Sequence, residues 1–210
     1  MELNIQFIDA DFDISETENA SWSLSADILI DKYWSGESAP RERQSRVKLL
    51  WSDNALYVRF KCSQFEPLVI SEDPDPTKKT KGLWDRDVCE IFIAPDPVFV
   101  DHYFEFEAAP TGEWIDLEIE KTGSKRSTSF DYNSGMTSAA QISGNEIIIA
   151  MKLPFAALSK VPVNGDAWRG NLFRIIGEGS TRGYLAWCPT ETAVPDFHVP
   201  GKFGKFHFVK

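Results

Sequence analysis

Apolar and polar residues alternate along most of this chain, in short runs that turn-forming residues separate. Successive side chains of a strand point to opposite faces, so such alternation predicts β-strands. Two pairs of runs flank the turn sequences Ser52-Asp53-Asn54 and Ser143-Gly144-Asn145 and predict β-hairpins. The paired runs are 47–51 with 56–61 and 137–142 with 146–153.

Further alternating runs predict the rest of the sheet. They cover 24–30, 87–94, 103–109, 113–120, 172–178, 183–187 and 203–209. Residues 121–135 are rich in Ser, Thr and Gly and predict a loop, and one short helix is expected after Pro154. About ten or more short strands with almost no helix predict an all-β fold, an antiparallel β-sandwich of the jelly-roll or immunoglobulin-like kind with at most one or two short helices. We expect one domain over residues 1–210.

The stretch Leu83–Pro95 contains the most informative residues. Both faces of its alternating pattern are mostly apolar, which predicts a strand that is covered on both sides. Glu90 therefore lies among apolar neighbours, where a carboxylate is costly unless a partner stabilises it. Trp84 precedes the strand on a polar loop. A loop tryptophan beside an in-strand glutamate is suited to gripping a small polar ligand that has an apolar face.

The charge of the chain narrows the choice of partners. With 22 basic and 32 acidic residues the net charge is −10, which argues against nucleic acid or an anionic membrane. No run has the length of a membrane span, and the N-terminal sequence lacks a signal-peptide pattern. We therefore expect a cytoplasmic protein, or a secreted or periplasmic one if a signal peptide has been removed.

Catalytic patterns are sparse. Cys62, Cys89 and Cys188 show no metal-binding or disulfide spacing and are expected to be buried free thiols. Glu105 and Glu107 share one face of a strand at roughly 6–7 Å, not far from the carboxyl spacing of glycosidases. Acidic residues on an outward face are usually only solvated, so we expect no enzyme. A glycan-active hydrolase that uses Glu90 or these two carboxyls is the alternative.

Sugar binding explains more of the sequence, because a sugar ring needs flat aromatic side chains for its C–H face and charged groups for its hydroxyls. Trp84 and Trp187 both lie where strands meet loops. An ordered set of motifs accompanies them over most of the chain. It comprises Trp51-Ser52-Asp53, Leu56-Tyr57-Val58, Leu83-Trp84-Asp85-x-Asp87-x-x-Glu90-x-Phe92, Tyr103-x-Glu105, Pro110-x-Gly112, Leu153-Pro154-Phe155, Trp168-x-x-Asn171-x-x-Arg174, Trp187-x-Pro189 and Phe197-His198-x-Pro200-x-x-Phe203-Gly204-x-x-x-Phe208.

With these motifs the chain resembles the family 9 carbohydrate-binding modules, within the DOMON-like group of β-sandwiches. The resemblance implies a sugar slot between Trp84 and Trp187, with Glu90 binding hydroxyls, that accepts a monosaccharide, a disaccharide or a glycan end. It also implies structural Ca²⁺, for which the loop Glu72–Asp75 offers oxygen ligands. Members usually accompany glycanases, so a separate glycan-degrading enzyme is an expected partner.

Four further residues are candidates from their chemistry and position: Arg86, Asp87, Arg174 and His198. Two of them have simpler explanations, since Arg174 could pair with an acidic neighbour on its strand and His198 could pin the long loop. A haem-binding, redox-active relative is a further alternative. Its axial ligands would have to come from His102, Met136 or Met151, which form no pattern typical of haem ligation.

Overall fold

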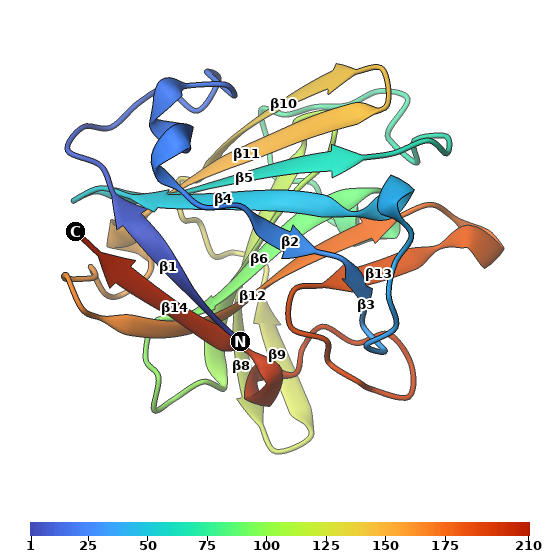
Figure 1. The fold of residues 1–210 in the computed structure, drawn as a ribbon. Helices are drawn as coiled ribbons and strands as arrows, with labels where there is room; N and C mark the ends of the chain where they lie inside the picture. Colours follow the sequence, from blue (N-terminus) through green and yellow to red (C-terminus); the bar gives the residue numbers. More distant parts are fainter.

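Strands form nearly all of the regular structure in the computed structural model, which describes all 210 residues (Figure 1). The strands are β1 (Glu2–Phe7), β2 (Ile28–Ile30), β3 (Lys32–Tyr33), β4 (Ser45–Trp51), β5 (Ala55–Ser63), β6 (Val88–Ala94), β7 (His102–Ala108), β8 (Trp114–Thr122), β9 (Lys125–Ser129), β10 (Thr137–Ser143), β11 (Glu146–Pro154), β12 (Ala167–Ile176), β13 (Gly183–Ala186) and β14 (Gly204–Val209). The only helical elements are the 3-10 turns η1 (Ala20–Leu24), η2 (Arg41–Arg43), η3 (Leu83–Asp85), η4 (Phe155–Ala157), η5 (Gly179–Thr181) and η6 (Pro200–Lys202). The predicted all-β fold is confirmed.

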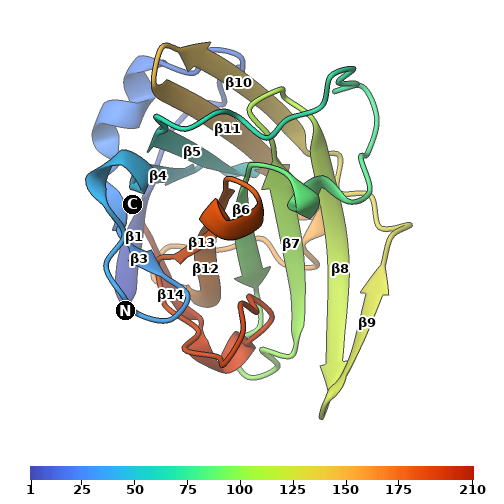
Figure 2. The same cartoon turned by 90° about the vertical axis from the view of Figure 1, so that its right-hand side faces the viewer.

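A single sheet runs in the order β10-β11-β5-β4-β1-β14-β12-β6-β7-β8-β9 and curls back on itself. One layer therefore contains β10, β11, β5 and β4, and the other contains β12, β6, β7 and β8 (Figure 2). A cluster of 32 buried residues fills the space between them. Val58 and Phe60 contribute to it from β5, and Ile91 and Phe106 from the other layer. The two-layer arrangement buries the apolar face of each half of the sheet against the other.

The sequence had predicted a purely antiparallel sheet, but the sheet is mixed. Strand β1 pairs in parallel with β14 on one side and with β4 on the other. The register places Ile5 opposite Phe208, and both are fully buried in the main core. Neither neighbour of β1 in the sheet is its neighbour in the sequence. No hairpin turn therefore joins β1 to its partners, and a hairpin pattern could not predict this pairing.

A second apolar cluster of 14 residues lies on the other face of β6, β7, β8 and β12. Alternation along β6 sends Cys89, Ile91 and Ile93 to the main core, and Val88 and Phe92 to this second cluster. The segment that ends in β14 covers the cluster with apolar side chains such as those of Phe197 and Phe203. The prediction that β6 is covered on both sides is thus confirmed.

Two short segments differ from the prediction. Residues 125–129 form the edge strand β9, where a loop was expected, and Thr128 pairs with Ile119 of β8. This strand is polar and mostly exposed on both faces, and its sequence carries no apolar alternation. The first predicted strand, 24–30, is shorter than expected: Leu24 belongs to the 3-10 turn η1, and only Ile28–Ile30 pair as a strand. The short helix expected after Pro154 is the 3-10 turn η4.

No helix in the structure has the length and apolar character needed to cross a membrane.

Candidate functional site

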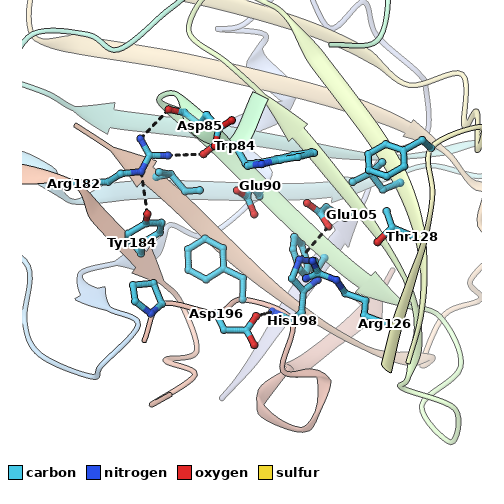
Figure 3. A pocket seen from close by; sticks show the side chains of 16 residues that line it. Trp84, Asp85, Glu90, Glu105, Arg126, Thr128, Arg182, Tyr184, Asp196 and His198 are labelled. Atoms are coloured by element: carbon cyan, nitrogen blue, oxygen red, sulfur yellow. Dashed lines mark hydrogen bonds and ion pairs between the residues drawn. The ribbon is translucent and has the colours of Figure 1, made fainter. Parts of the chain in front are cut away.

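A cavity of about 450 Å³ opens on the face of β6, β7 and β8 that points away from the main core (Figure 3). Its floor carries Glu90, Phe92, Glu105 and Leu117. One wall is the turn that presents Trp84, and the opposite walls are β9 with the residues after it and the segment 195–198. The cavity therefore lies at the feature that the sequence singled out, the loop tryptophan beside the in-strand glutamate.

Strand register explains how the floor residues converge. Glu105 on β7 lies opposite Phe92 on β6 and opposite Leu117 on β8. Residues two positions apart on a strand share a face, so Glu90 points to the same side as Phe92. The polar floor is thus a product of sequence alternation on neighbouring strands.

Two buried carboxyl groups lie at this floor, those of Glu90 and Glu105, and a third, that of Glu107, is buried next to them. Glu90, Glu105 and Glu107 are 2%, 4% and 0% exposed, and Glu90 lies directly opposite Glu107 in the β6–β7 ladder. No N–H or hydroxyl group of the protein donates to Oε2 of Glu105 or to either carboxyl oxygen of Glu107. Burial raises the pKa of all three groups, and the charge of Glu105 raises the pKa of Glu90 further. The floor is therefore rich in hydrogen-bond acceptors that lack a protein donor.

The expectation that Glu105 and Glu107 belong to a solvated outward face was wrong. Phe104 and Phe106 of the same strand enter the main core, as their alternation predicted. The opposite face is also covered, because the second apolar cluster includes Tyr103 of β7. Alternation assigned the two faces correctly, and the covering segment from the distant C-terminal part of the chain could not be foreseen.

Arg182 fixes the turn that carries Trp84. Its guanidinium donates to the carbonyl oxygens of Asp85 and Gly177, each at 3.0 Å, and to that of Trp84. Its Nε also donates to the hydroxyl of Tyr184, 3.1 Å away (Figure 3). Arg182 thereby links η3 to β13 and holds the tryptophan at the rim of the cavity.

Arg126 is the other guanidinium of the cavity, and it belongs to β9. Its side chain is exposed, and its positive charge lowers the pKa of Glu105 against the larger effect of burial. No sequence pattern pointed to Arg126, because β9 lay in a segment predicted to be a loop.

His198 lines the cavity and also secures its wall. Its Nδ1 lies 2.9 Å from the hydroxyl of Tyr103, and Lys121 donates to its backbone carbonyl at 2.6 Å. Burial, followed by the charge of Arg126, lowers the pKa of His198 to about 3, so the ring is neutral at pH 7. When the Tyr103 hydroxyl donates to Nδ1, the proton of the ring lies on Nε2, which is 3.9 Å from Oε2 of Glu105. His198 thus offers the cavity a neutral N–H donor.

The aromatic partner of Trp84 is Phe130. The two ring centroids lie 6.4 Å apart with an interplanar angle of 47°. Lys79 holds the Phe130 segment in place, because its ammonium contacts the carbonyl oxygens of Phe130 and Tyr132 and the carboxylate of Asp116, the last at 2.6 Å. Phe130 is a cavity residue that the sequence reasoning missed, since it lies in the Ser/Thr/Gly-rich segment.

Trp187 does not face Trp84 in the structure. It is 4% exposed in the main core, 5.8 Å from the ring of Phe206, and it is not a cavity residue. Leu185 enters the same core, and a residue two positions further along an extended chain takes the same side. The expected slot between Trp84 and Trp187 is therefore absent, and Tyr184 lines the cavity from β13 instead.

Arg86, Asp87 and Arg174 were also predicted as site residues, and all three lie outside the cavity. Arg86 is near the buried carboxylate of Glu113, at 3.4 Å. Asp87 accepts hydrogen bonds from the backbone N–H groups of Val69 and Gly177 and from Gln64. These two predicted side chains stabilise the segments around the strand and take no part in the cavity.

Arg174 is buried and donates to the carbonyl oxygens of Arg43 and Ser63, at 2.8 and 2.9 Å. Its other terminal nitrogen donates to Gln64 at 3.0 Å. The acidic strand neighbour that the sequence suggested is not its partner, since carbonyl and amide oxygens satisfy the guanidinium. Its role in this structure is to join β12 to the segments around β4 and β5.

The three thiols are free and buried, as predicted. The sulfurs of Cys62 and Cys89 lie 3.5 Å apart inside the main core. Cys188 packs there as well, next to Trp187. None of the three lines the cavity.

The donor set does not fit the structural Ca²⁺ that the resemblance implied. In the acidic loop, Asp75 accepts hydrogen bonds from the backbone N–H and hydroxyl of Thr77 and pairs with Lys78 at 2.8 Å. Nowhere in the chain do three His, Cys, Asp or Glu side chains converge closely enough to hold a metal ion. A calcium site needs six to eight oxygen ligands, and the side chains of this loop do not supply a cluster of them.

Residues 14–210 match the model of a protein family described as "Carbohydrate family 9 binding domain-like". This match spans the whole cavity and confirms the resemblance seen in the sequence motifs. No curated protein matches the chain.

Solved structures share the fold. One is a protein from Bacteroides uniformis ATCC 8492 described as carbohydrate-binding, with a TM-score of 0.78, 15% identity and coverage of 99% of this chain and 98% of that chain. A family 9 carbohydrate-binding module from Caldicellulosiruptor kristjanssonii was solved with cellotriose, at a TM-score of 0.68, 16% identity and coverage of 100% and 94%. Its complex with glucose gives a TM-score of 0.68, 16% identity and coverage of 99% and 95%.

Proposed function

Because the chain belongs to the carbohydrate family 9 binding domain-like family, we propose that the cavity beside Trp84 is its sugar site. The expected ligand is a monosaccharide, a short oligosaccharide or the end of a glycan. The cavity volume of about 450 Å³ lies within the usual range of small-ligand sites, roughly 300–1,000 Å³.

One observation carries this proposal: an aromatic rim stands above a floor of buried acceptors that lack protein donors. Trp84 and Phe130 offer apolar surface to the C–H face of a sugar ring. Glu90 and Glu105 offer carboxyl groups to its hydroxyl groups, and a hydrogen bond to an ionised carboxylate is about twice as strong as one between neutral groups. His198 adds an N–H donor. These are the two kinds of contact that a sugar needs.

The related module from Caldicellulosiruptor kristjanssonii supports the same class of ligand, since it was solved with cellotriose and with glucose. A mono- or oligosaccharide is accordingly the ligand proposed for this chain. Trp84 supplies one aromatic wall. Phe130 is the second, in place of the Trp187 that the sequence suggested.

Hydrolysis is the less suitable role for this site. A glycosidase places two carboxyl groups on either side of the bond that breaks. Glu90 and Glu105 belong to adjacent strands of one floor and approach a ligand from the same side. The family is one of binding domains, and binding without catalysis accounts for both glutamates.

Isothermal titration calorimetry with glucose, cellobiose and cellotriose tests the proposal. We expect saturable binding by the unmodified protein and a loss of affinity of about tenfold or more in Trp84→Ala, because the stacking surface is removed. Phe99→Ala is the matched control, since Phe99 is an exposed aromatic residue outside the cavity. Equal affinities for the unmodified protein and Trp84→Ala would contradict the assignment of this cavity.

A further inference from the structure

We infer that the sugar preferred by this cavity carries a primary amine, so that the ligand is a hexosamine rather than a neutral hexose. This inference rests on the proposed function and specifies its ligand. The geometry that supports it is the excess of buried acceptors over donors at the floor.

The charges around the cavity do not balance. Four carboxyl groups line it, those of Asp85, Glu90, Glu105 and Asp196, and two guanidinium groups, those of Arg126 and Arg182. A fifth carboxyl, that of Glu107, is fully buried directly opposite Glu90. The carboxyl groups of this site therefore outnumber its guanidinium groups, and the negative charge that appears when a buried carboxyl ionises has no free cation of the protein beside it.

The positive groups already present cannot supply the missing donors to the floor. Arg182 uses its Nε and both terminal nitrogens on the Trp84 turn, on Gly177 and on Tyr184. Arg126 lies on the exposed edge strand β9 and donates to no carboxyl oxygen of the floor. His198 is neutral, and its Nε2 remains 3.9 Å from Glu105. Oε2 of Glu105 consequently receives no hydrogen bond from a basic side chain of the protein, although Glu105 is only 4% exposed.

An ammonium group suits this set of carboxyl oxygens better than a metal ion does. No three acidic or histidine side chains converge as metal ligands would, so the acceptors are spread over the floor. An ammonium group carries three N–H donors with separate directions, and a carboxylate accepts them as charge-assisted hydrogen bonds. A hexose hydroxyl donates only one hydrogen bond and leaves the negative charge uncompensated. The amine of a hexosamine thus supplies both the donors and the charge.

Calorimetric titration at pH 7 with glucosamine, glucose and N-acetylglucosamine tests the inference. Glucosamine differs from glucose in the amine alone, and N-acetylglucosamine retains the nitrogen without its charge. We expect glucosamine to bind about tenfold more tightly than either of the others, the usual value of one additional charged hydrogen bond. A preference for glucosamine that disappears when the pH is raised enough to deprotonate its amine would support the charge-based reading.

Glu105→Gln and Glu90→Gln keep the size of the side chain and remove its charge. We expect each to weaken the binding of glucosamine more than that of glucose, so that the preference for glucosamine falls to about twofold or less. Glu118→Gln is the matched control, because Glu118 lies on β8, pairs with His102 and does not line the cavity. That variant should keep the full preference.

The titrations distinguish a failure of the amine preference from a failure of sugar binding itself. Equal binding of glucose and glucosamine, or tighter binding of glucose, would overturn this inference and leave the proposed function standing. An undiminished preference in both glutamine variants would also overturn it. Failure of every sugar to bind a correctly folded protein would overturn the proposed function, and the inference with it.

Discussion

Glu90 on β6 and Glu107 on β7 lie directly opposite each other in the ladder, and both are buried. Two carboxyl groups so placed cannot both ionise without a large cost, since each charge opposes the other in a region of low polarity. Burial is the larger cause of the raised pKa of Glu107, and the charge of Glu90 is the next. The pair lies at and just beneath the cavity floor, which makes it a source of pH dependence.

The stability of the protein should therefore fall as pH rises above 4.5, the ordinary pKa of a glutamate. The folded-state pKa of Glu107 is raised, so the folded protein binds more protons than the unfolded chain between the two pKa values. The contribution is fully present below 4.5 and is lost as pH rises through the folded-state pKa. Each such proton changes the free energy of unfolding by up to about 1.4 kcal/mol per pH unit.

Glu107→Gln isolates this contribution. Other groups titrate nearby, among them Glu105, Glu90 and His198, so the measurement is the difference between the variant and the unmodified protein. Denaturant unfolding at several pH values between 4.5 and 8 should show the variant gaining relative stability as pH rises. A difference that stays constant over this range would show that Glu107 keeps an ordinary pKa.

Lys79 is predicted to be essential for the wall that carries Phe130. Its removal in Lys79→Met leaves the carboxylate of Asp116, which is 0% exposed, without its cation. Breaking a buried ion pair on one side costs about 3–5 kcal/mol, and the Phe130 segment loses two of its anchoring hydrogen bonds. We expect a lower unfolding free energy and weaker sugar binding.

The double variant Lys79→Met/Asp116→Asn serves as the control for this prediction, because it removes the unpaired charge together with its partner. It should recover a large part of the lost stability in chemical denaturation. Sugar affinity should remain reduced, since the Phe130 carbonyl still lacks its donor. Full recovery of affinity would show that Lys79 does not position the aromatic wall.

Gly204→Ala tests the location of Trp187 in the core. A Cβ atom built on Gly204 would lie 2.3 Å from the Trp187 ring, and the rigid indole cannot move away cheaply. Overpacking of this kind usually costs about 1–3 kcal/mol. Thermal unfolding should show the loss, whereas the sugar affinity of the folded variant should be unchanged. A large loss of affinity with normal stability would place Trp187 at the ligand instead.

The cysteines should be unreactive in the folded protein. Cys62 and Cys89 are each 1% exposed and Cys188 is 6% exposed. A thiol reagent such as 5,5′-dithiobis(2-nitrobenzoic acid) should label none of them at short times and all of them in denaturant. Rapid labelling without denaturant would reveal an opening of the sandwich that exposes the main core.

The sequence was sufficient to predict that Trp84 and Glu90 lie close together, because this depends on local order: a loop is followed at once by an alternating strand. The sequence did not predict that the Trp187 side chain enters the main core, because the face it takes depends on how β13 packs against the rest of the sheet. It also failed for Arg126 and Phe130, which belong to a polar edge strand and the segment after it. Edge strands bury little, and their sequences need no apolar alternation. Contacts between distant segments therefore decided which of the predicted residues reached the cavity.

The parallel insertion of β1 between β14 and β4 makes folding depend on the whole chain. The partners Glu2 and Lys205 are 203 positions apart in sequence. Pairing over such a separation is slow, since much chain entropy is lost before the contact forms. Until β14 has been synthesised, its two neighbours in the sheet, β1 and β12, present unpaired edges that can join another molecule. Trimming either end of the chain would leave such an edge permanently open, so aggregation should be the first sign of a shortened version.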